Sequence, residues 1–382
     1  MTSIVDLQTL RRAARSFTLP WEVQWRFWLV RSPWLVPNSI LKITSPEGPH
    51  PFVIYLPSWN GQHKIPLYVF LPSEEQVLKH GDRGVPVHLD FHGGGFIMGS
   101  CLEQAPFCAM LTRERACITI SVDYRKGPID QFPAAIEDAE DALAAILDAD
   151  GKSEGSSTLR KQIEQHWREK SEGDTAPPIT LDPSRISISG FSSGGNLALN
   201  LALDIHTPEI NWPGLLPHDG PAIPLLLFYP SLDSRLMPHE RPRSGNMPPP
   251  NPTSFLGSIG PVLSPTYLPK EMRDHPRASP GLADTAGLNS RARVFLVLPE
   301  IDTLANQSEE WIRKMQNEGH DGVLEVYRAR GMRHGWTQFP ETFVSKEALE
   351  EKRKVFQRTV EFMREVQDGA NPQIPGTGVF IK

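Results

Sequence analysis

Two adjacent serines lie between glycines in the stretch Gly190-Phe191-Ser192-Ser193-Gly194. The G-x-S-x-G spacing is typical of a sharp turn between a strand and a helix that exposes a nucleophilic serine. Small residues are needed two positions before and after that serine, because the strand and the helix must approach each other closely. Ser192 has glycine at both positions, whereas Ser193 has Phe191 two positions before it. The pattern therefore predicts Ser192 as the nucleophile and the backbone N–H of Ser193 as a donor to a developing oxyanion.

Three consecutive glycines follow a histidine in the stretch HGGGF at residues 92–96. Glycine adopts backbone conformations that other residues rarely reach, and it lets a ligand come close to the main chain. Loops of this type direct backbone N–H groups at the carbonyl oxygen of an ester. We therefore predict that Gly93 and Gly94 are oxyanion donors beside Ser193. No Gly-Lys-Ser/Thr follows the glycines, which argues against a phosphate-binding loop.

A serine nucleophile requires a general base and an acid that orients the base. Among twelve histidines, His334 in the stretch GMRHGW follows a candidate strand and would lie at its carboxyl end. Asp302, in the stretch LPEIDTL, also follows a candidate strand and is the predicted acid. Glu300 is the alternative acid, two residues closer to that strand. The chain order serine, aspartate, histidine is that of the α/β hydrolases and differs from the orders in chymotrypsin and subtilisin.

Eight apolar or alternating segments indicate the strands that would position these residues. They cover residues 51–57, 64–72, 85–91, 116–124, 185–190, 222–230, 291–299 and 322–329. Helical patterns follow at 132–149, 196–206, 304–319 and 346–366. Antiparallel-looking strands followed by strand–helix alternation predict an α/β fold with a mostly parallel eight-stranded central sheet and helices on both faces. Such sheets bind ligands beyond the carboxyl ends of their strands, where the candidate residues would meet.

An aromatic segment near the start of the chain predicts a further helix. Within residues 21–34, Trp21, Trp25 and Trp28 recur at helical spacing with Leu29 beside them, which indicates an amphipathic helix with an aromatic stripe. We interpret this helix as packed on the body of the protein. A cap over an apolar pocket and a contact with a membrane surface are the alternatives.

Two later segments interrupt the strand–helix alternation. Residues 150–180 are polar and indicate a surface insertion with one short helical piece. Residues 231–290 contain a proline-dense loop that can form neither a central strand nor a regular helix. Because this loop follows the carboxyl end of a strand, it lies where a lid would lie.

The composition is that of an ordinary globular protein. The 382 residues include 39 basic and 45 acidic ones, with a formal net charge of −6. No long run of one sign occurs, which argues against binding to nucleic acid or to an anionic membrane. The three cysteines resemble neither a disulfide framework nor a zinc site, so reduced thiols are expected. The first residues lack the apolar core of a secretory signal and no apolar run could span a bilayer, which predicts a cytoplasmic protein.

Five segments of the chain resemble the hormone-sensitive-lipase-type branch of the α/β-hydrolase superfamily. They are HGGGF at 92–96, VDYRKGPIDQFPAAIEDA at 122–139, GFSSGGNLA at 190–198, PEIDTL at 299–304 and MRHGW at 332–336. They occur in the order of the family, within roughly residues 65–365. The resemblance implies an α/β-hydrolase fold with Ser192 as nucleophile and Asp302 orienting His334. It also implies that Gly93 and Gly94 help to form the oxyanion hole.

The resemblance further implies a catalytic domain over residues 46–382. The cap would consist of residues 1–45 together with an insertion at about 231–275. Two features depart from the family pattern. Phe191 and Ser193 flank the nucleophile where an acidic residue and an alanine are common, and Ile129 stands where a glutamate is usual. Neither departure removes a group that the reaction needs.

These features together predict a serine hydrolase that cleaves carboxylic esters through a Ser-His-Asp triad and an acyl-enzyme. The reaction needs no metal or organic cofactor, and the substrate would be a small ester or acyl compound with an apolar portion. An acyltransferase, a cyclase or a chain-releasing hydrolase of a secondary-metabolite pathway could use the same triad. A non-catalytic ligand-binding receptor is a third alternative, although plant receptors that resemble the family lack the histidine present here as His334. A homodimer is the candidate oligomeric state.

Overall fold

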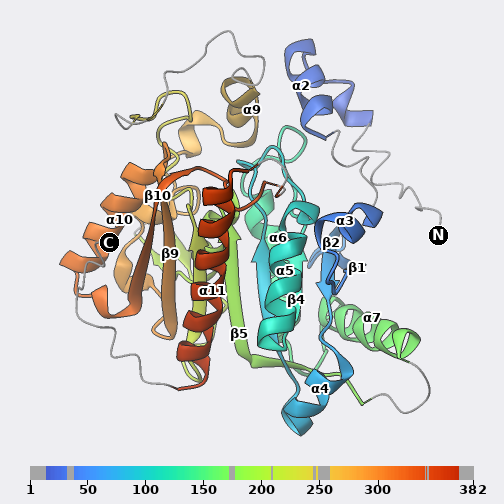
Figure 1. Ribbon diagram of the computed structural model, residues 1–382. Coiled ribbons are helices and arrows are strands. Elements are labelled where there is room, and N and C mark those ends of the chain that lie inside the picture. The colour runs from blue at the N-terminus through green and yellow to red at the C-terminus, as the bar shows by residue number, and fades with distance from the viewer. Residues whose placement is uncertain are drawn as a thin grey trace.

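An eight-stranded sheet forms the centre of the protein (Figure 1). This computed structural model describes residues 14–31, 38–171, 177–207, 210–243, 247, 259–339, 341 and 344–369. The strands, in the order in which they lie side by side, are β1 (Phe52–Pro57), β2 (Lys64–Phe70), β4 (Ile118–Val122), β3 (Val85–Phe91), β5 (Leu181–Phe191), β8 (Ile223–Phe228), β9 (Ala292–Ile301) and β10 (Leu324–Arg333). The β1–β2 and β2–β4 pairs are antiparallel, and the remaining pairs are parallel. The predicted strands and the mostly parallel sheet are confirmed.

The central strands are apolar because helices cover the sheet on both faces. Every residue of β3, β4 and β8 is buried, as expected for strands inside an α/β sheet. β9 and β10 continue to Ile301 and Arg333, farther than their predicted ends at 299 and 329. Their carboxyl ends therefore lead directly into Asp302 and His334, the predicted acid and base.

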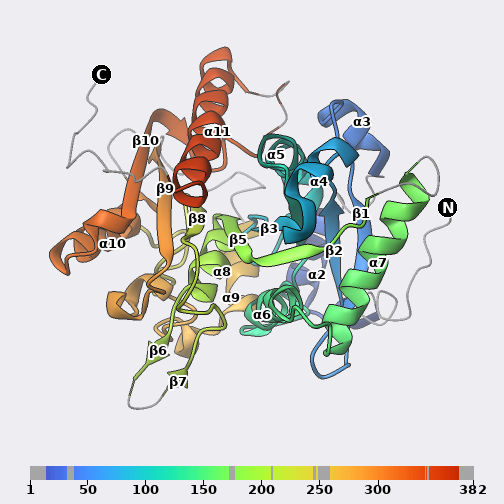
Figure 2. The same cartoon turned by 90° about the horizontal axis from the view of Figure 1, so that it is seen from below.

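The helices form a layer on each face of the sheet, as Figure 2 shows. One layer contains α5 (Cys101–Arg115) and α11 (Lys346–Gln367), and the other contains α6 (Ala134–Leu147), α8 (Ser193–Leu201) and α10 (Ala305–Asn317). On the side of α5 and α11, Phe191 stacks on Phe228 with ring centroids 4.2 Å apart, and Phe107 meets both rings edge-on. Phe191, the neighbour of the candidate nucleophile, therefore belongs to the core.

Short helices lie at the edges and in the loops. They are α3 (Leu41–Thr44), α4 (Glu74–His80) and the 3₁₀ helices Asn38–Ile40, Gly81–Arg83, Lys270–Met272, Pro280–Leu282, Thr285–Gly287 and Asp321–Val323. α4 begins with a capping box, in which Ser73 and Gln76 each bond to the backbone N–H of the other.

The helix predicted over residues 196–206 begins and ends earlier in the structure than predicted. α8 begins at Ser193 and ends at Leu201, and Ile205–His206 (β6) pairs with Asn211–Trp212 (β7) in a short hairpin. The reason lies at Asp204, whose backbone N–H donates to the Gly287 carbonyl and whose carboxylate accepts from the Gly214 N–H. These tertiary bonds replace the bonds that would continue the helix.

The prediction of one short helix within residues 150–180 is wrong in its length. α7 (Glu154–Lys170) has 17 residues and packs on α6 and β1. It buries Leu159, Ile163 and Trp167, which are four residues apart and so share one face. The polar remainder of the segment concealed this apolar stripe.

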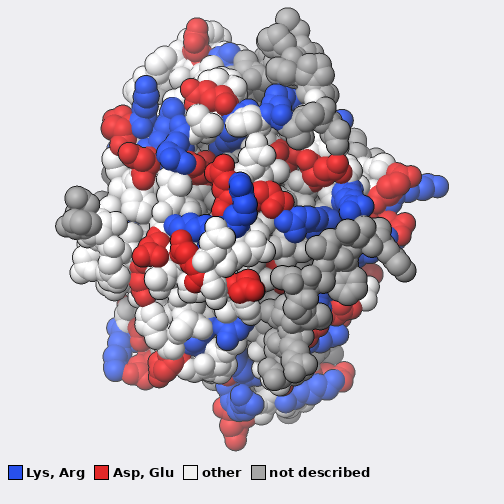
Figure 3. Space-filling view, turned by 90° about the vertical axis from the view of Figure 1, so that its left-hand side faces the viewer, with Lys and Arg blue, Asp and Glu red and all other residues white. Residues whose placement is uncertain are grey.

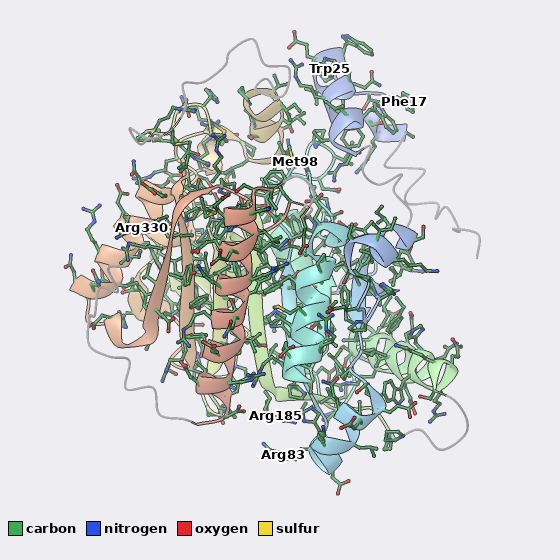
Figure 4. All side chains as sticks on the ribbon, viewed as in Figure 1. Phe17, Trp25, Arg83, Met98, Arg185 and Arg330 are labelled. Atoms are coloured by element: carbon green, nitrogen blue, oxygen red, sulfur yellow. The ribbon has the colours of Figure 1, made fainter. Side chains whose placement is uncertain are left out.

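The N-terminal helix α2 (Trp21–Arg31) packs on α9 (Ile259–Tyr267), beyond the carboxyl ends of the strands (Figure 1). Figure 4 shows Phe17 and Trp25 at the end of the molecule where Met98 lies, and Arg83 and Arg185 at the opposite end. Both helices belong to the segments of the predicted cap. Residues 1–13, 32–37, 244–246 and 248–258 of that cap lie outside the described residues.

The tryptophan stripe of α2 is not its packing face. Trp21 and Trp28 are 73 % and 43 % exposed, whereas Phe27 and Arg31 are buried. The Arg31 guanidinium donates from Nη2 to the Gly127 carbonyl at 3.1 Å. This bond to the body of the protein turns the face with Phe27 and Arg31 inward.

Charged side chains of both signs are mixed on the surface. On the face in Figure 3, lysines and arginines are interspersed with aspartates and glutamates. The cysteines at positions 101, 108 and 117 are buried and free. Within the described residues, no helix is both long and apolar enough to cross a membrane.

Candidate active site

Ser192 lies in a strained turn between β5 and α8. Its φ is +55°, a region that residues other than glycine rarely adopt. The turn is held because the Ser192 N–H donates to the Phe228 carbonyl at 2.9 Å, and the Ser231 N–H donates to the Ser192 carbonyl at 3.0 Å. Bonds from two directions compensate for the strain and fix the serine at the carboxyl edge of the sheet.

The glycines on either side of Ser192 are required by close backbone contacts. A Cβ on Gly190 would lie 2.0 Å from the Gly194 carbonyl oxygen, and a Cβ on Gly194 would lie 2.1 Å from the Phe91 carbonyl oxygen. No side chain fits at such distances. The glycines at positions 190 and 194, which distinguish Ser192 from Ser193 in the sequence, are therefore required by the packing of the turn.

Ser192, His334 and Asp302 form a continuous chain of hydrogen bonds. His334 Nε2 is 2.9 Å from Ser192 Oγ, and His334 Nδ1 is 2.7 Å from Asp302 Oδ2. A carboxylate only accepts, so Nδ1 carries the proton and Nε2 is free to accept from the serine hydroxyl. The second Asp302 oxygen accepts from the Leu304 N–H at 2.8 Å. This bond prevents the carboxylate from turning away from the imidazole.

The carboxylate of Asp302 is buried, whereas the imidazole of His334 is partly exposed. The side chain of Asp302 is 1 % exposed and that of His334 is 38 % exposed. Glu300, the alternative acid, instead accepts a hydrogen bond from the Gly331 N–H at 2.7 Å. The structure thus brings Asp302 to the imidazole.

The glycine loop packs against the serine turn. A Cβ on Gly93 would lie 3.1 Å from the Phe191 carbonyl oxygen, and Gly94 has a φ of +126° that favours glycine. Tyr124 donates from its hydroxyl to the His92 carbonyl at 2.8 Å and lies 3.2 Å from Ser193 Oγ. Gly93, Gly94 and Ser193 are therefore gathered beside Ser192. Ser193 is the first residue of α8, and N–H groups in the first turn of a helix have no partner within the helix.

A family model described as the α/β-hydrolase fold matches residues 88–338, which is more than half of the chain. The chain belongs to the α/β-hydrolase family. The matched residues include the glycine loop, the serine turn, Asp302 and His334, and the predicted resemblance to the hormone-sensitive-lipase-type branch is confirmed.

Curated relatives and solved structures resemble this α/β hydrolase over most of its length. An α/β-hydrolase superfamily protein of Schizosaccharomyces pombe is 23 % identical over 69 % of this chain and 66 % of its own length. This chain thus spans just under two thirds of that relative. A probable carboxylesterase of Arabidopsis thaliana is 23 % identical over 82 % of this chain and 85 % of its own. An esterase structure from Pyrobaculum calidifontis superposes with a TM-score of 0.59 at 21 % identity, over 96 % of this chain and 99 % of that chain, and shows the shared fold.

Two residues beside the hydrogen-bond chain of Ser192, His334 and Asp302 were not predicted from the sequence. Tyr229 directly follows β8, and its ring meets that of His334 edge-on with centroids 4.9 Å apart. Its hydroxyl bonds to that of Thr337, so it supports the loop that carries His334. The position of Tyr229 after a buried strand was the available signal.

Arg241 brings a positive charge from the loop after β8 towards the acid. Burial lowers the pKa of Arg241 to about 10, while the charges of Asp302 and Asp233 act in the opposite direction. Its side chain also lines a hollow of about 200 Å³ that Thr303 and Glu310 border. No sequence signal marked this arginine, since its relation to Asp302 arises only in the folded chain.

The strand before the glycine loop carries a buried polar cluster. His88 bonds to Ser187 and Ser189 at 2.8 Å each, and Asp90 accepts from Ser189 at 2.6 Å and Ser121 at 2.8 Å. Burial lowers the pKa of His88 to about 3 and raises that of Asp90 to about 6. These bonds join β3 to β4 and β5, so the cluster fixes the strand beneath the glycine loop.

Proposed function

We propose that this α/β hydrolase cleaves carboxylic esters, with Ser192 as nucleophile, His334 as general base and Asp302 as the orienting acid. The observation that carries the proposal is the hydrogen-bond chain from Ser192 Oγ through His334 to Asp302, at 2.9 and 2.7 Å. The carboxylesterase and esterase names of similar proteins support the same reaction.

The reaction proceeds through an acyl-enzyme. His334 Nε2 takes the hydroxyl proton of Ser192 as Oγ attacks the acyl carbon, and the carbonyl oxygen becomes an oxyanion. The N–H groups of Gly93, Gly94 and Ser193 stabilise that charge. The imidazolium then gives its proton to the departing alcohol as the tetrahedral intermediate collapses. Water, deprotonated by His334, attacks the acyl-enzyme, and the serine recovers its proton as the acid leaves.

Aromatic side chains near the glycine loop support a substrate with an apolar portion. Phe96 stacks on Tyr267 of α9 with centroids 4.5 Å apart, so two aromatic rings lie between the glycine loop and α9. Met98 follows at the same end of the molecule (Figure 4). A small ester with an apolar acyl or alcohol group is therefore the proposed substrate class. The cytoplasmic location, the homodimer, and the bounds of the catalytic domain and the cap stay predictions.

The paired serines provide a matched test of the nucleophile. Turnover of aryl esters of graded acyl length is measured for the wild type, Ser192→Ala and Ser193→Ala. We expect Ser192→Ala to lower kcat by at least about 10⁴-fold, since it removes the attacking oxygen. Ser193→Ala keeps its backbone N–H and is expected to stay within about tenfold of the wild type. Wild-type turnover by Ser192→Ala would overturn the proposal.

The same assay distinguishes hydrolysis from acyl transfer. With an added alcohol or amine present, we expect the free carboxylic acid as the main product. An ester or amide of the added nucleophile as the main product would assign the chain to the acyltransferase alternative instead.

A further inference from the structure

A buried lysine, Lys126, contacts the histidine that begins the glycine loop. Lys126 Nζ is 3.1 Å from His92 Nε2, and the lysine side chain is 3 % exposed. The charge of Lys126 is balanced by an ion pair with Asp123, whose Oδ1 lies 3.5 Å from the same His92 nitrogen. The His92 ring stacks on Tyr124 with centroids 4.3 Å apart and planes at 13°. The first residue of the HGGGF segment is thus held on its ring face and at both ring nitrogens.

The partners of His92 determine which ring nitrogen carries the proton. An ammonium group has only donors, so His92 Nε2 accepts from Lys126. The Gly93 carbonyl oxygen is 2.6 Å from His92 Nδ1 and only accepts, so Nδ1 carries the proton. Burial, with the Lys126 charge adding to it, lowers the pKa of His92 to about 4. The ring is therefore neutral at pH 7, in the Nδ1–H tautomer.

Hydrogen bonds to the His92 and Gly93 carbonyls set the direction of the N–H groups of Gly93 and Gly94. In a trans peptide, the C=O and the N–H of the next residue point in opposite directions. The bond from His92 Nδ1 to the Gly93 carbonyl therefore turns the Gly94 N–H away from the His92 ring. In the same way, the bond from Tyr124 to the His92 carbonyl at 2.8 Å turns the Gly93 N–H away from the tyrosine. These are the two N–H groups that the proposed mechanism uses to stabilise the oxyanion.

Close packing protects the bond between His92 and Gly93. A Cβ on Gly99 would lie 2.1 Å from the Gly93 carbonyl oxygen and 2.8 Å from His92 Nδ1. Gly99 has a φ of +88°, so glycine suits this position in both conformation and space. The backbone of the following turn therefore closes over the bond, and water has little room to replace the histidine.

We propose that Lys126 is a positioning residue for the oxyanion hole and that it acts through the His92 ring. The lysine holds the ring in the Nδ1–H tautomer, the ring holds the Gly93 carbonyl, and the peptide then presents the Gly94 N–H to the oxyanion. The proposal rests on the ester hydrolysis proposed above. Without the ammonium donor, the ring can take the Nε2–H tautomer, and the Gly93 carbonyl loses its donor.

Three variants test this role. Lys126→Met removes the donor, Lys126→Arg keeps a cationic donor, and the double variant Asp123→Ala/Lys126→Met removes both charges, so that no unpaired carboxylate stays buried. We expect Lys126→Met to lower kcat for an aryl ester by about 10- to 100-fold with KM within about threefold, because Asp123 can then accept from His92 Nε2–H, and because oxyanion donors act in the transition state. The double variant leaves the Gly93 carbonyl as the acceptor for the ring, so it should recover most of kcat. Lys126→Arg should also retain more of kcat than Lys126→Met.

Two further readouts separate positioning from a merely structural role. The affinity for an alkyl boronic acid, which forms a tetrahedral adduct on Ser192, should fall by the same factor as kcat. Nitrogen-15 NMR of histidine-labelled protein, with His92 assigned from the His92→Gln variant, should show the Nδ1–H tautomer in the wild type. That signature should be lost in Lys126→Met and kept in the double variant.

The outcomes distinguish the two proposals. Unchanged kcat, unchanged boronic-acid affinity and an unchanged His92 tautomer in folded Lys126→Met would overturn the role of Lys126 and leave ester hydrolysis standing. The same losses in the double variant as in Lys126→Met would overturn it too. Wild-type protein without Ser192-dependent ester turnover would overturn the proposed function, and the role of Lys126 in an oxyanion hole with it.

Discussion

The serine turn with its glycine loop and the predicted cap with its α2 helix lie at the same end of the sheet, yet they are held differently. In the turn, one added Cβ on Gly190 or Gly194 would come within 2.0 or 2.1 Å of a backbone oxygen. In α2, Trp21 and Trp28 are more than 40 % exposed, and the contact depends on Phe27 and Arg31. Catalysis requires that a few atoms keep fixed positions, which tight backbone packing provides. A helix that only covers a site needs fewer buried contacts.

The acid of the triad should show the largest effect. Asp302→Asn replaces an oxygen that accepts from His334 Nδ1 by a group that can also donate, and the imidazole can then present the wrong tautomer to Ser192. We expect kcat to fall by about 10⁴-fold. Glu300→Gln, two residues away, is the matched control and should change kcat less than tenfold. Equal losses in the two variants would mean that the hydrogen-bond chain does not identify the acid.

A glycine in each region gives the sharpest test of how the two regions are held. Gly194→Ala places a Cβ 2.1 Å from the Phe91 carbonyl oxygen, and we expect it to lower the free energy of unfolding by about 3 kcal/mol or more. Gly260→Ala lies in α9 of the cap, where a Cβ meets no atom within 4 Å. Its free energy of unfolding should change by less than about 1 kcal/mol. Urea unfolding measures both free energies. Similar values for the two variants would show that the serine turn is packed no more tightly than α9.

Acid should weaken the strand beneath the glycine loop through His88. The pKa of the folded-state His88 is about 3, so the folded protein cannot take up the proton that the unfolded chain binds below pH 6.5. The stabilisation by neutral His88 is therefore complete above pH 6.5 and is lost as the pH falls towards 3. Between pH 7 and pH 5, the wild type should lose about 2 kcal/mol more free energy of unfolding than His88→Gln. Identical losses would show that the strand tolerates a charged His88.

Substitutions in the predicted cap should change KM more than kcat. Phe27→Ala removes a buried ring from α2, and we expect KM for a bulky aryl ester to rise by about tenfold while kcat for an acetate ester stays within about twofold. Trp28→Ala removes a ring that is 43 % exposed and should leave both values close to the wild type. A larger effect of Trp28→Ala would indicate that the exposed face of α2 contacts the substrate.

Short motifs at strand ends made the fold predictable, and they singled out the three residues that the structure joins in a hydrogen-bond chain. The glycine spacing around Ser192 follows from backbone contacts between neighbours in the chain, so the sequence alone carries the information. Asp302 and His334 were found because each follows a recognisable apolar strand, and parallel strands bring their carboxyl ends to one edge of the sheet.

Contacts between distant segments explain what the sequence did not reveal. Lys126 acquires its role from His92, which is 34 residues earlier in the chain. The buried face of α2 could not be chosen, since both the tryptophans and the stripe with Val23 and Phe27 are apolar at helical spacing. For α7 the signal was present at Leu159, Ile163 and Trp167, but the polar composition of the surrounding segment outweighed it.

Covalent labelling gives the most direct evidence on whether Ser192 is the nucleophile of an ester hydrolase. The wild-type protein is treated with an alkyl fluorophosphonate, which phosphonylates an activated serine, and its peptides are analysed by mass spectrometry. We expect a single adduct on Ser192 that appears in step with the loss of ester turnover and is absent from His334→Ala. An adduct on Ser193 or on another serine, or loss of turnover without labelling of Ser192, would contradict the assignment of Ser192 as the nucleophile.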